Sequence, residues 1–329
     1  MKKALFTLVL IFASALHLQS SEPVKYDYLS SNYYIRMANA TLDYLKGNYK
    51  CAYDTLICLE NDIPLLNTPE YDEMRTFLEL SLMYENYDKA YKYLIVLIED
   101  YGYKAKFFND FKNIKKLRKQ KIYDSKKIKY LEKNFVSDTA IVHTIEAMRE
   151  REQFFRRLPI KTDTFPKLQC GDTSWRHPYA KQFDSIDKIN YKILIQLIHQ
   201  NGFPLSKNMK YMFMDRITVY RCIMPILMHI NDSSWFEEMK SVLIENIRNG
   251  DCPPQLLGNM VDRHYLSTKK FIYGIYNNTS KEQIFDLPNL DKRRAEIGLP
   301  PHKVKCEIEN LFHKKYFSQS NISVENCDF

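Results

Sequence analysis

The chain repeats one pattern at an offset of 38 residues, first as Gly47-Asn48-Tyr49-Lys50-Cys51-Ala52-Tyr53 and again as Glu85-Asn86-Tyr87-Asp88-Lys89-Ala90-Tyr91. Asparagine, tyrosine, alanine and a second tyrosine recur at matching places in the two copies. The apolar residues that follow keep the same offset: Leu56, Ile57 and Leu59 in the first copy, and Leu94, Ile95 and Leu97 in the second. A fixed period of this size is typical of stacked helical hairpins. The sequence therefore predicts at least two such hairpins in the N-terminal half.

The first copy resembles the tetratricopeptide repeat in detail. Small Ala40 and Ala52 stand where the paired helices of that repeat approach closely, Gly47 stands in the turn, and Pro64 ends the unit. The second copy has Glu85 in place of the glycine, so its match is partial. The resemblance implies tetratricopeptide-like hairpins that present a groove to a protein or peptide. An ordinary helical bundle with a chance similarity is the alternative.

Two copies are too few for a stable array, which usually needs three or more repeats. The segment 104–133 is predicted to supply further helices, because its apolar residues lie at helical spacing: Phe107, Phe108, Phe111, Ile114 and Leu117. The same segment carries twelve lysines and arginines against three acidic residues. This charge favours a solvated helix face, and a surface for phosphate-bearing polymers or anionic lipid is the alternative.

The N-terminus has the layout of a secretory signal peptide. Lys2 and Lys3 precede an apolar run over residues 5–12, and Ala13-Ser14-Ala15 is a small-residue cleavage pattern. We therefore assign residues 1–21 to a signal peptide and expect an exported protein, either periplasmic or extracellular. No later segment approaches the roughly 18 apolar residues of a membrane-spanning helix, so we expect no transmembrane segment. Export also argues against a nucleic-acid partner.

Composition favours a folded helical chain. Hydrophobic residues make up 45% of the 329 residues and charged residues 27%, and only 8 glycines argue against a turn-rich β fold. Seven cysteines cannot all pair within one chain. Cys51 and Cys58, on one predicted helix, are too far apart to bridge. A bond between Cys306 and Cys327 and a set of reduced, buried thiols both remain open. Without a C-x-x-C pair or a cofactor motif, we expect neither a metal site nor a cofactor.

The second half is predicted to be helical as well. Apolar stripes end at Asn201-Gly202 and Asn249-Gly250, and Pro253-Pro254 opens a further helix. A stretch with proline and glycine over 158–178 predicts a linker. The predicted fold class is all-α. Its organisation is a tetratricopeptide-like repeat module at 22–140, a second helical domain at 141–316 and a C-terminal tail at 317–329.

Several short motifs between about His143 and Lys303 resemble, in order and spacing, the bacterial family catalogued as domain of unknown function 6624. They are Asn201-Gly202-Phe203-Pro204, His229 with Asp232, Asp262-Arg263, Tyr273-Gly274, Arg293-Arg294 and Ile297-Gly298-Leu299-Pro300. Near Tyr273-Gly274 the chain departs from the family, because it has Phe271, Ile275 and Tyr276 where polar residues are usual. The family has no assigned reaction, so the resemblance implies a shared fold and a candidate site but no activity.

The candidate site consists of polar residues set among apolar helical stretches: His229, Asp262, Arg263, Tyr273, Arg293 and Arg294. We expect Asp262 and Arg263 to be held close to Arg293 or Arg294, because a charge in apolar surroundings needs a partner. Two functions remain open. A protein- or peptide-binding scaffold of the bacterial envelope is favoured, since no catalytic motif is present. The alternative is an envelope enzyme in which His229 and Asp262 transfer protons and arginine holds an anionic substrate. Buried, mutually paired side chains favour the first, and an open pocket favours the second.

Overall fold

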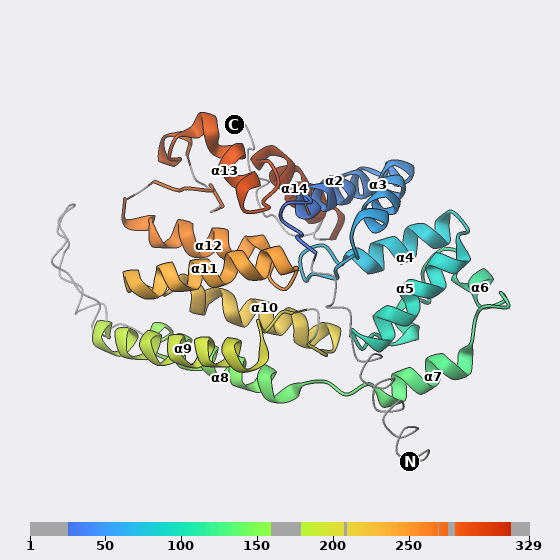
Figure 1. Ribbon diagram of the computed structural model, residues 1–329, viewed down its shortest axis with the longest axis horizontal. Coiled ribbons are helices and arrows are strands. Elements are labelled where there is room, and N and C mark those ends of the chain that lie inside the picture. Colours follow the sequence, from blue (N-terminus) through green and yellow to red (C-terminus); the bar gives the residue numbers. More distant parts are fainter. Residues whose placement is uncertain (1–25, 159–178, 207–208, 269, 276–279, 317–329) are drawn as a thin grey trace, which may run out of the picture.

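The chain is seen in a computed structural model that describes residues 26–158, 179–206, 209–268, 270–275 and 280–316 (Figure 1). These residues form thirteen α-helices and no β-strand, which confirms the predicted all-α fold class. The predicted signal peptide, the linker beyond Leu158 and the C-terminal tail lie outside the described residues. None of the helices in the described ranges combines the length and the apolar character needed to span a bilayer.

Two helical hairpins stand where the sequence repeat predicts them. The paired helices are α2 (Tyr33–Lys46) with α3 (Tyr49–Asp62), and α4 (Glu73–Met83) with α5 (Tyr87–Glu99). This pairing is consistent with tetratricopeptide-like repeats. The side chains of Ala52 and Ala90 have no exposed surface, and Ala40 has almost none. Each small residue therefore lies at a packed contact with no room for a longer side chain.

Enlarging either buried alanine to leucine is expected to destabilise the protein. Ala52→Leu and Ala90→Leu would each force extra methylene groups into a filled core and lower the free energy of unfolding by about 1–3 kcal/mol. Thermal or urea unfolding of purified variants measures the loss. Ala147→Leu, at an exposed place on a later helix, is the matched control and should change little. Unaltered unfolding of both hairpin variants would contradict the close approach of the paired helices.

Both hairpin turns contain a residue at positive φ, but the residue differs between them. Gly47 has a φ of +83°, and no atom lies within 4 Å of the place that a Cβ would occupy there. Glu85, at the equivalent place of the second copy, has a φ of +56°. A side chain in this left-handed region costs about 1–2 kcal/mol, whereas glycine adopts it freely.

Opposite substitutions at these two turns are expected to have opposite effects. Gly47→Ala should lower the free energy of unfolding by about 1 kcal/mol, and Glu85→Gly should raise it by about 0.5–1 kcal/mol. The exposed ion pair between Glu85 and Lys116, at 2.6 Å, should subtract little from that gain. Urea denaturation of both variants provides the measurement. Shifts of the same sign would show that the turns are not equivalent.

The segment 104–133 does not form the regular helices that its apolar spacing predicts. It contains a 3-10 turn at Ala105–Phe108, the single-turn helix α6 (Ile114–Leu117) and α7 (Ser125–Asn134), which packs against α5. Asn113, at a φ of +64°, interrupts the chain immediately before α6. Phe107 is 59% exposed, whereas Phe108 is buried, so the apolar residues do not share one helix face. Eleven of the twelve basic side chains are exposed, in agreement with a solvated surface.

Most of the remaining helices form a second packed group, and the last two, α13 and α14, follow them in the chain (Figure 1). They are α8 (Thr139–Arg156), α9 (Ala180–Asn201), α10 (Phe213–Met228), α11 (Ser233–Asn249), α12 (Pro254–His264), α13 (Leu290–Glu296) and α14 (His302–Tyr316). The central helix α10 packs against α8, α9 and α12. Gly202 and Gly250, both at positive φ, end α9 and α11 at the places where the sequence predicts helix ends.

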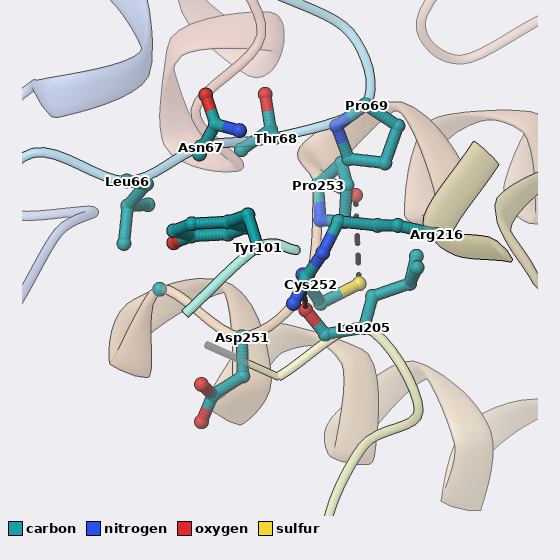
Figure 2. Close-up of a pocket in the computed structure, with 11 residues that line it drawn as sticks. Leu66, Asn67, Thr68, Pro69, Tyr101, Leu205, Arg216, Asp251, Cys252 and Pro253 are labelled. Carbon is teal, nitrogen blue, oxygen red and sulfur yellow. Dashed lines mark hydrogen bonds between the residues drawn. The ribbon is translucent and has the colours of Figure 1, made fainter. Parts of the chain in front are cut away.

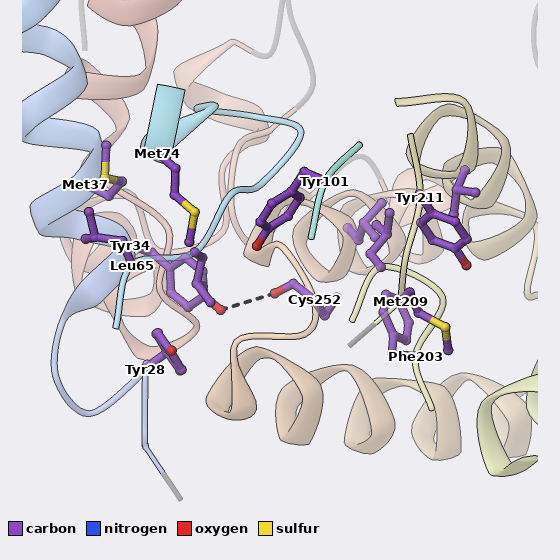
Figure 3. Close-up of a cluster of buried hydrophobic side chains, with 14 of the residues drawn as sticks. Tyr28, Tyr34, Met37, Leu65, Met74, Tyr101, Phe203, Met209, Tyr211 and Cys252 are labelled. Atoms are coloured by element: carbon purple, nitrogen blue, oxygen red, sulfur yellow. Dashed lines mark hydrogen bonds between the residues drawn. The ribbon is translucent and has the colours of Figure 1, made fainter. Parts of the chain in front are cut away.

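The two halves of the chain share a hydrophobic core. The last helix, α14, returns to pack against α2. The Tyr34 hydroxyl donates to the carbonyl of Ile247 at 2.8 Å and is 3.4 Å from the carbonyl of Cys252. Figure 3 shows Tyr34 directed at Cys252, within the buried cluster that also contains Met37 and Met74 of the hairpins. Since these contacts cross the predicted boundary at residues 140–141, which lies in the first turn of α8, each half buries apolar surface of the other.

Candidate functional site

Asp262 anchors a loop through its carboxylate. It lies on α12 with no exposed surface. Its Oδ1 accepts the backbone N–H groups of Ile272 and Tyr273, and its Oδ2 accepts that of Ile275, each at 2.8 Å. Burial raises the pKa of Asp262, and the three N–H donors and the positive charge of Arg294 oppose that rise. The carboxylate is therefore engaged in holding residues 272–275.

Two arginines of α13 hold the same loop from the other side. The guanidinium of Arg294, which is fully buried, donates to the carbonyl of Tyr273 at 2.6 Å and to that of Pro300 at 2.7 Å. Arg293 donates to the carbonyl of Ile272 at 3.1 Å. We call Asp262, Arg293, Arg294 and the loop 271–275 the loop clamp. Four of the six residues of the predicted site thus come together, and Tyr273 takes part through its backbone.

The other two residues of the predicted site lie apart from the clamp contacts. Arg263 is half-buried at the end of α12 and forms no ion pair or side-chain hydrogen bond with a described residue. His229 follows the last residue of α10, and its Nδ1 lies 2.8 Å from Oε1 of Glu152 on α8. The structure therefore places His229 beside a carboxylate, but that carboxylate is Glu152 and not the predicted Asp262.

Glu152 belongs to a chain of alternating charges that no sequence motif predicts. Arg156, one turn later on α8, contacts both Glu152 and Asp187 of α9, the latter at 3.2 Å. Burial would raise the pKa of Glu152, but His229, Gln153 and Arg156 outweigh it and lower that pKa. Burial raises the pKa of Asp187 to about 6 despite the nearby Arg156 and His229. Only the four-residue spacing of Glu152 and Arg156 hinted at this cluster, and that spacing is common on solvated helices.

Metal ligation finds no support in the described part of the chain. No group of three or more histidine, cysteine, aspartate or glutamate side chains there is placed to hold a metal ion. The imidazole of His264 stacks on the ring of Phe236, with their centroids 3.8 Å apart. Cys51 and Cys58 are free, exposed thiols, and Cys222 and Cys252 are free and buried.

A pocket of about 300 Å3 lies where the hairpins meet the C-terminal helices. We call it the junction pocket. Its walls come from the loop between α3 and α4 (Glu70 and Tyr71), α10 (Tyr220 and Met224), α12 (Gln255 and Asn259) and α14 (Lys305, Ile308, Glu309, Phe312 and His313), with Pro300. Ligand pockets commonly span about 300–1,000 Å3, so this one suits a single side chain or a small molecule.

Glu70 gives the junction pocket its unusual electrostatics. Its half-buried carboxyl forms no hydrogen bond or ion pair with a described residue. Burial raises its pKa to about 8, the negative charges of Glu73 and Glu309 add to the rise, and Lys305 opposes it. The Lys305 ammonium is itself paired with the Glu309 carboxylate at 2.8 Å. At neutral pH the empty pocket therefore keeps Glu70 largely protonated.

On its other side, the loop that carries Glu70 faces Arg216. There Arg216 of α10 lies against a cavity of about 10 Å3, which has room for about one water molecule (Figure 2). Arg216 donates to the carbonyls of Leu205 at 2.8 Å and Met209 at 2.9 Å, and its guanidinium lies 5.0 Å from the ring centre of Tyr101. Burial lowers the pKa of Arg216, and the nearby tyrosines oppose that change. Arg216 and Tyr220, one turn apart on α10, thus line the cavities on the two sides of the loop.

Comparison with known proteins adds no relative. No family model, no curated protein and no solved structure matches the chain.

Proposed function

We propose that this chain is an exported binding protein of the bacterial envelope, which recognises a protein or peptide partner by taking one of its side chains into the junction pocket. The observation that carries the proposal is the pocket of about 300 Å3 lined by both the hairpins and the C-terminal helices. It combines aromatic walls with a carboxyl that has no described partner, which is the mixture of apolar surface and few polar groups typical of recognition sites.

Binding is favoured over catalysis because the polar residues of the predicted site are engaged elsewhere. The Asp262 carboxylate accepts three backbone N–H groups, and Arg294 donates to two carbonyls. The enzyme alternative needs His229 and Asp262 to act on one substrate, but His229 is paired with Glu152. The loop clamp also accounts for several motifs that resemble domain of unknown function 6624. We propose that this resemblance reflects a shared loop architecture.

A peptide-display selection on the immobilised mature protein tests the binding function. Selected peptides should bind the wild-type protein and lose binding to Gln255→Trp, because the indole would fill the junction pocket. Gln196→Trp, at an exposed place on α9, is the matched control and should bind normally. Peptides that bind Gln255→Trp as well as wild type would place recognition outside the pocket. Failure to select any peptide would count against peptide binding altogether.

The predicted export can be tested separately. If Lys2-Lys3, the apolar run and Ala13-Ser14-Ala15 act as a signal peptide, the mature N-terminus should lie between Leu16 and Glu22. N-terminal sequencing of the protein purified from its native host measures this directly. Cytosolic protein that retains Met1 would contradict export and the envelope location.

A further inference from the structure

The junction pocket has an unbalanced acidic group. Lys305 and Glu309 are 2.8 Å apart and neutralise each other. Nearby Arg294 donates to the carbonyls of Tyr273 and Pro300. The carboxyl of Glu70 also lines the pocket, and it contacts no cationic side chain among the described residues. Because an ionised carboxyl in a partly dehydrated pocket needs an opposite charge, a cation is the ligand that would stabilise it most.

The other walls also suit a cation. Tyr71 and Tyr220 line the pocket beside Glu70, and an ammonium or guanidinium group is attracted to the face of such rings. Gln255 and Asn259 of α12 add side-chain amides, whose oxygens accept hydrogen bonds from N–H donors. An anionic ligand would meet Glu70 and Glu309 on the same walls, with Lys305 already paired.

We infer that the junction pocket binds the charged end of a lysine or arginine side chain, with Glu70 as its counter-ion and Tyr71 and Tyr220 as its aromatic walls. This inference rests on the proposed function and names the chemistry that the pocket selects. Apolar stems of such side chains pack well against rings while the charged head reaches a carboxylate.

Binding of a cation must release a proton. Burial raises the pKa of Glu70 to about 8, so below that pH the carboxyl carries its proton in most molecules that have no cation bound. When a ligand ammonium enters, the O–H bond of Glu70 breaks, the proton passes to the buffer, and the resulting carboxylate pairs with the ammonium. Affinity should therefore rise about tenfold per pH unit up to about pH 8 and then level off. The titratable and charged groups around Glu70 are Tyr71, Glu73, Tyr220, Cys252, Arg294, Lys305, Glu309 and His313.

Isothermal titration calorimetry on the mature protein tests the inference. The probes are the Nα-acetyl methylamides of lysine and arginine, with those of norleucine and glutamate as the neutral and acidic comparisons. Titrations at pH 6, 7, 8 and 9, in buffers of different ionisation enthalpy, report affinity and the number of protons released. We expect binding of the two cationic probes alone, with release of nearly one proton at pH 6 and of very little at pH 9.

Two variants separate Glu70 from general charge effects. Glu70→Gln should weaken binding of both cationic probes at least tenfold at pH 8 and abolish proton release. Glu99→Gln, which removes an exposed carboxyl on α5, should leave both quantities unchanged. The inference is overturned if norleucine or glutamate binds as well as lysine, if Glu70→Gln keeps the pH dependence, or if neither cationic probe binds at millimolar concentration. Display-selected peptides that lack lysine and arginine but fail to bind Gln255→Trp would leave the proposed function intact while refuting this ligand class.

Discussion

Asp262→Asn is expected to lower the free energy of unfolding by about 3–5 kcal/mol, the loss typical of breaking a buried charged network. An asparagine oxygen can still accept from Ile272 and Tyr273, but its Nδ2 group would face the N–H of Ile275, so two donors would meet. The substitution also removes a negative charge that stabilises the charged form of the buried Arg294 guanidinium. Urea denaturation at pH 7 measures the change.

Two further variants make this result specific to the loop clamp. Asp286→Asn removes an aspartate 3.3 Å from Arg293, but this carboxylate is 42% exposed, so the loss should be below about 1 kcal/mol. The double variant Asp262→Asn with Arg294→Met should lose less than the sum of its single changes, because each single change leaves a buried partner uncompensated. Equal losses for Asp262→Asn and Asp286→Asn would show that the clamp does not hold the fold. Intact stability with loss of an anionic ligand would instead restore the enzyme alternative.

The sequence predicts the hairpins well because their signals are local. The spacing of Ala52 and Ala90 and of the turn residues Gly47 and Glu85 reflects contacts within one repeat. Helix ends at Gly202 and Gly250 are likewise set by backbone conformations that glycine adopts readily. Local spacing misleads over 104–133, where residues at helical intervals are divided between short turns, since an apolar period does not reveal where the chain bends.

The sites depend on contacts between distant residues, which carry no local pattern. Glu152 meets His229 across 77 positions of sequence, and both stand in stretches that favour helix in any case. The junction pocket forms only because α14 returns to α2 while α10 meets the loop that carries Glu70. In the sequence, Asn67-Thr68-Pro69-Glu70-Tyr71 is an ordinary turn-forming stretch. The raised pKa of Glu70 arises only in the folded chain, where Tyr220 and Glu309 lie around it.

Glu70→Gln is expected to stabilise the protein in mildly alkaline solution and to leave it nearly unchanged at pH 4. The pKa of Glu70 is raised from 4.5 in the unfolded chain to about 8 in the folded one. Between these values the folded state binds more protons than the unfolded state, so the free energy of unfolding falls as the pH rises and levels off above about pH 8. At about 1.4 kcal/mol per pKa unit the full loss approaches about 5 kcal/mol, and water in the pocket should reduce it to about 2–4 kcal/mol.

Urea denaturation from pH 4 to pH 9 measures this difference for wild type and variant. The glutamine cannot ionise, so the free energy of unfolding of the variant should fall less with rising pH than that of the wild type. Some decline should remain, because burial also raises the pKa of Glu73 to about 7 and that of Asp187 to about 6. Glu99→Gln serves again as the control and should keep the wild-type decline in stability between pH 6 and pH 8. Parallel curves for wild type and Glu70→Gln would mean that Glu70 is ionised in the empty pocket at neutral pH. In that case cation binding would release no proton, and the recognition of lysine or arginine would lose its pH dependence.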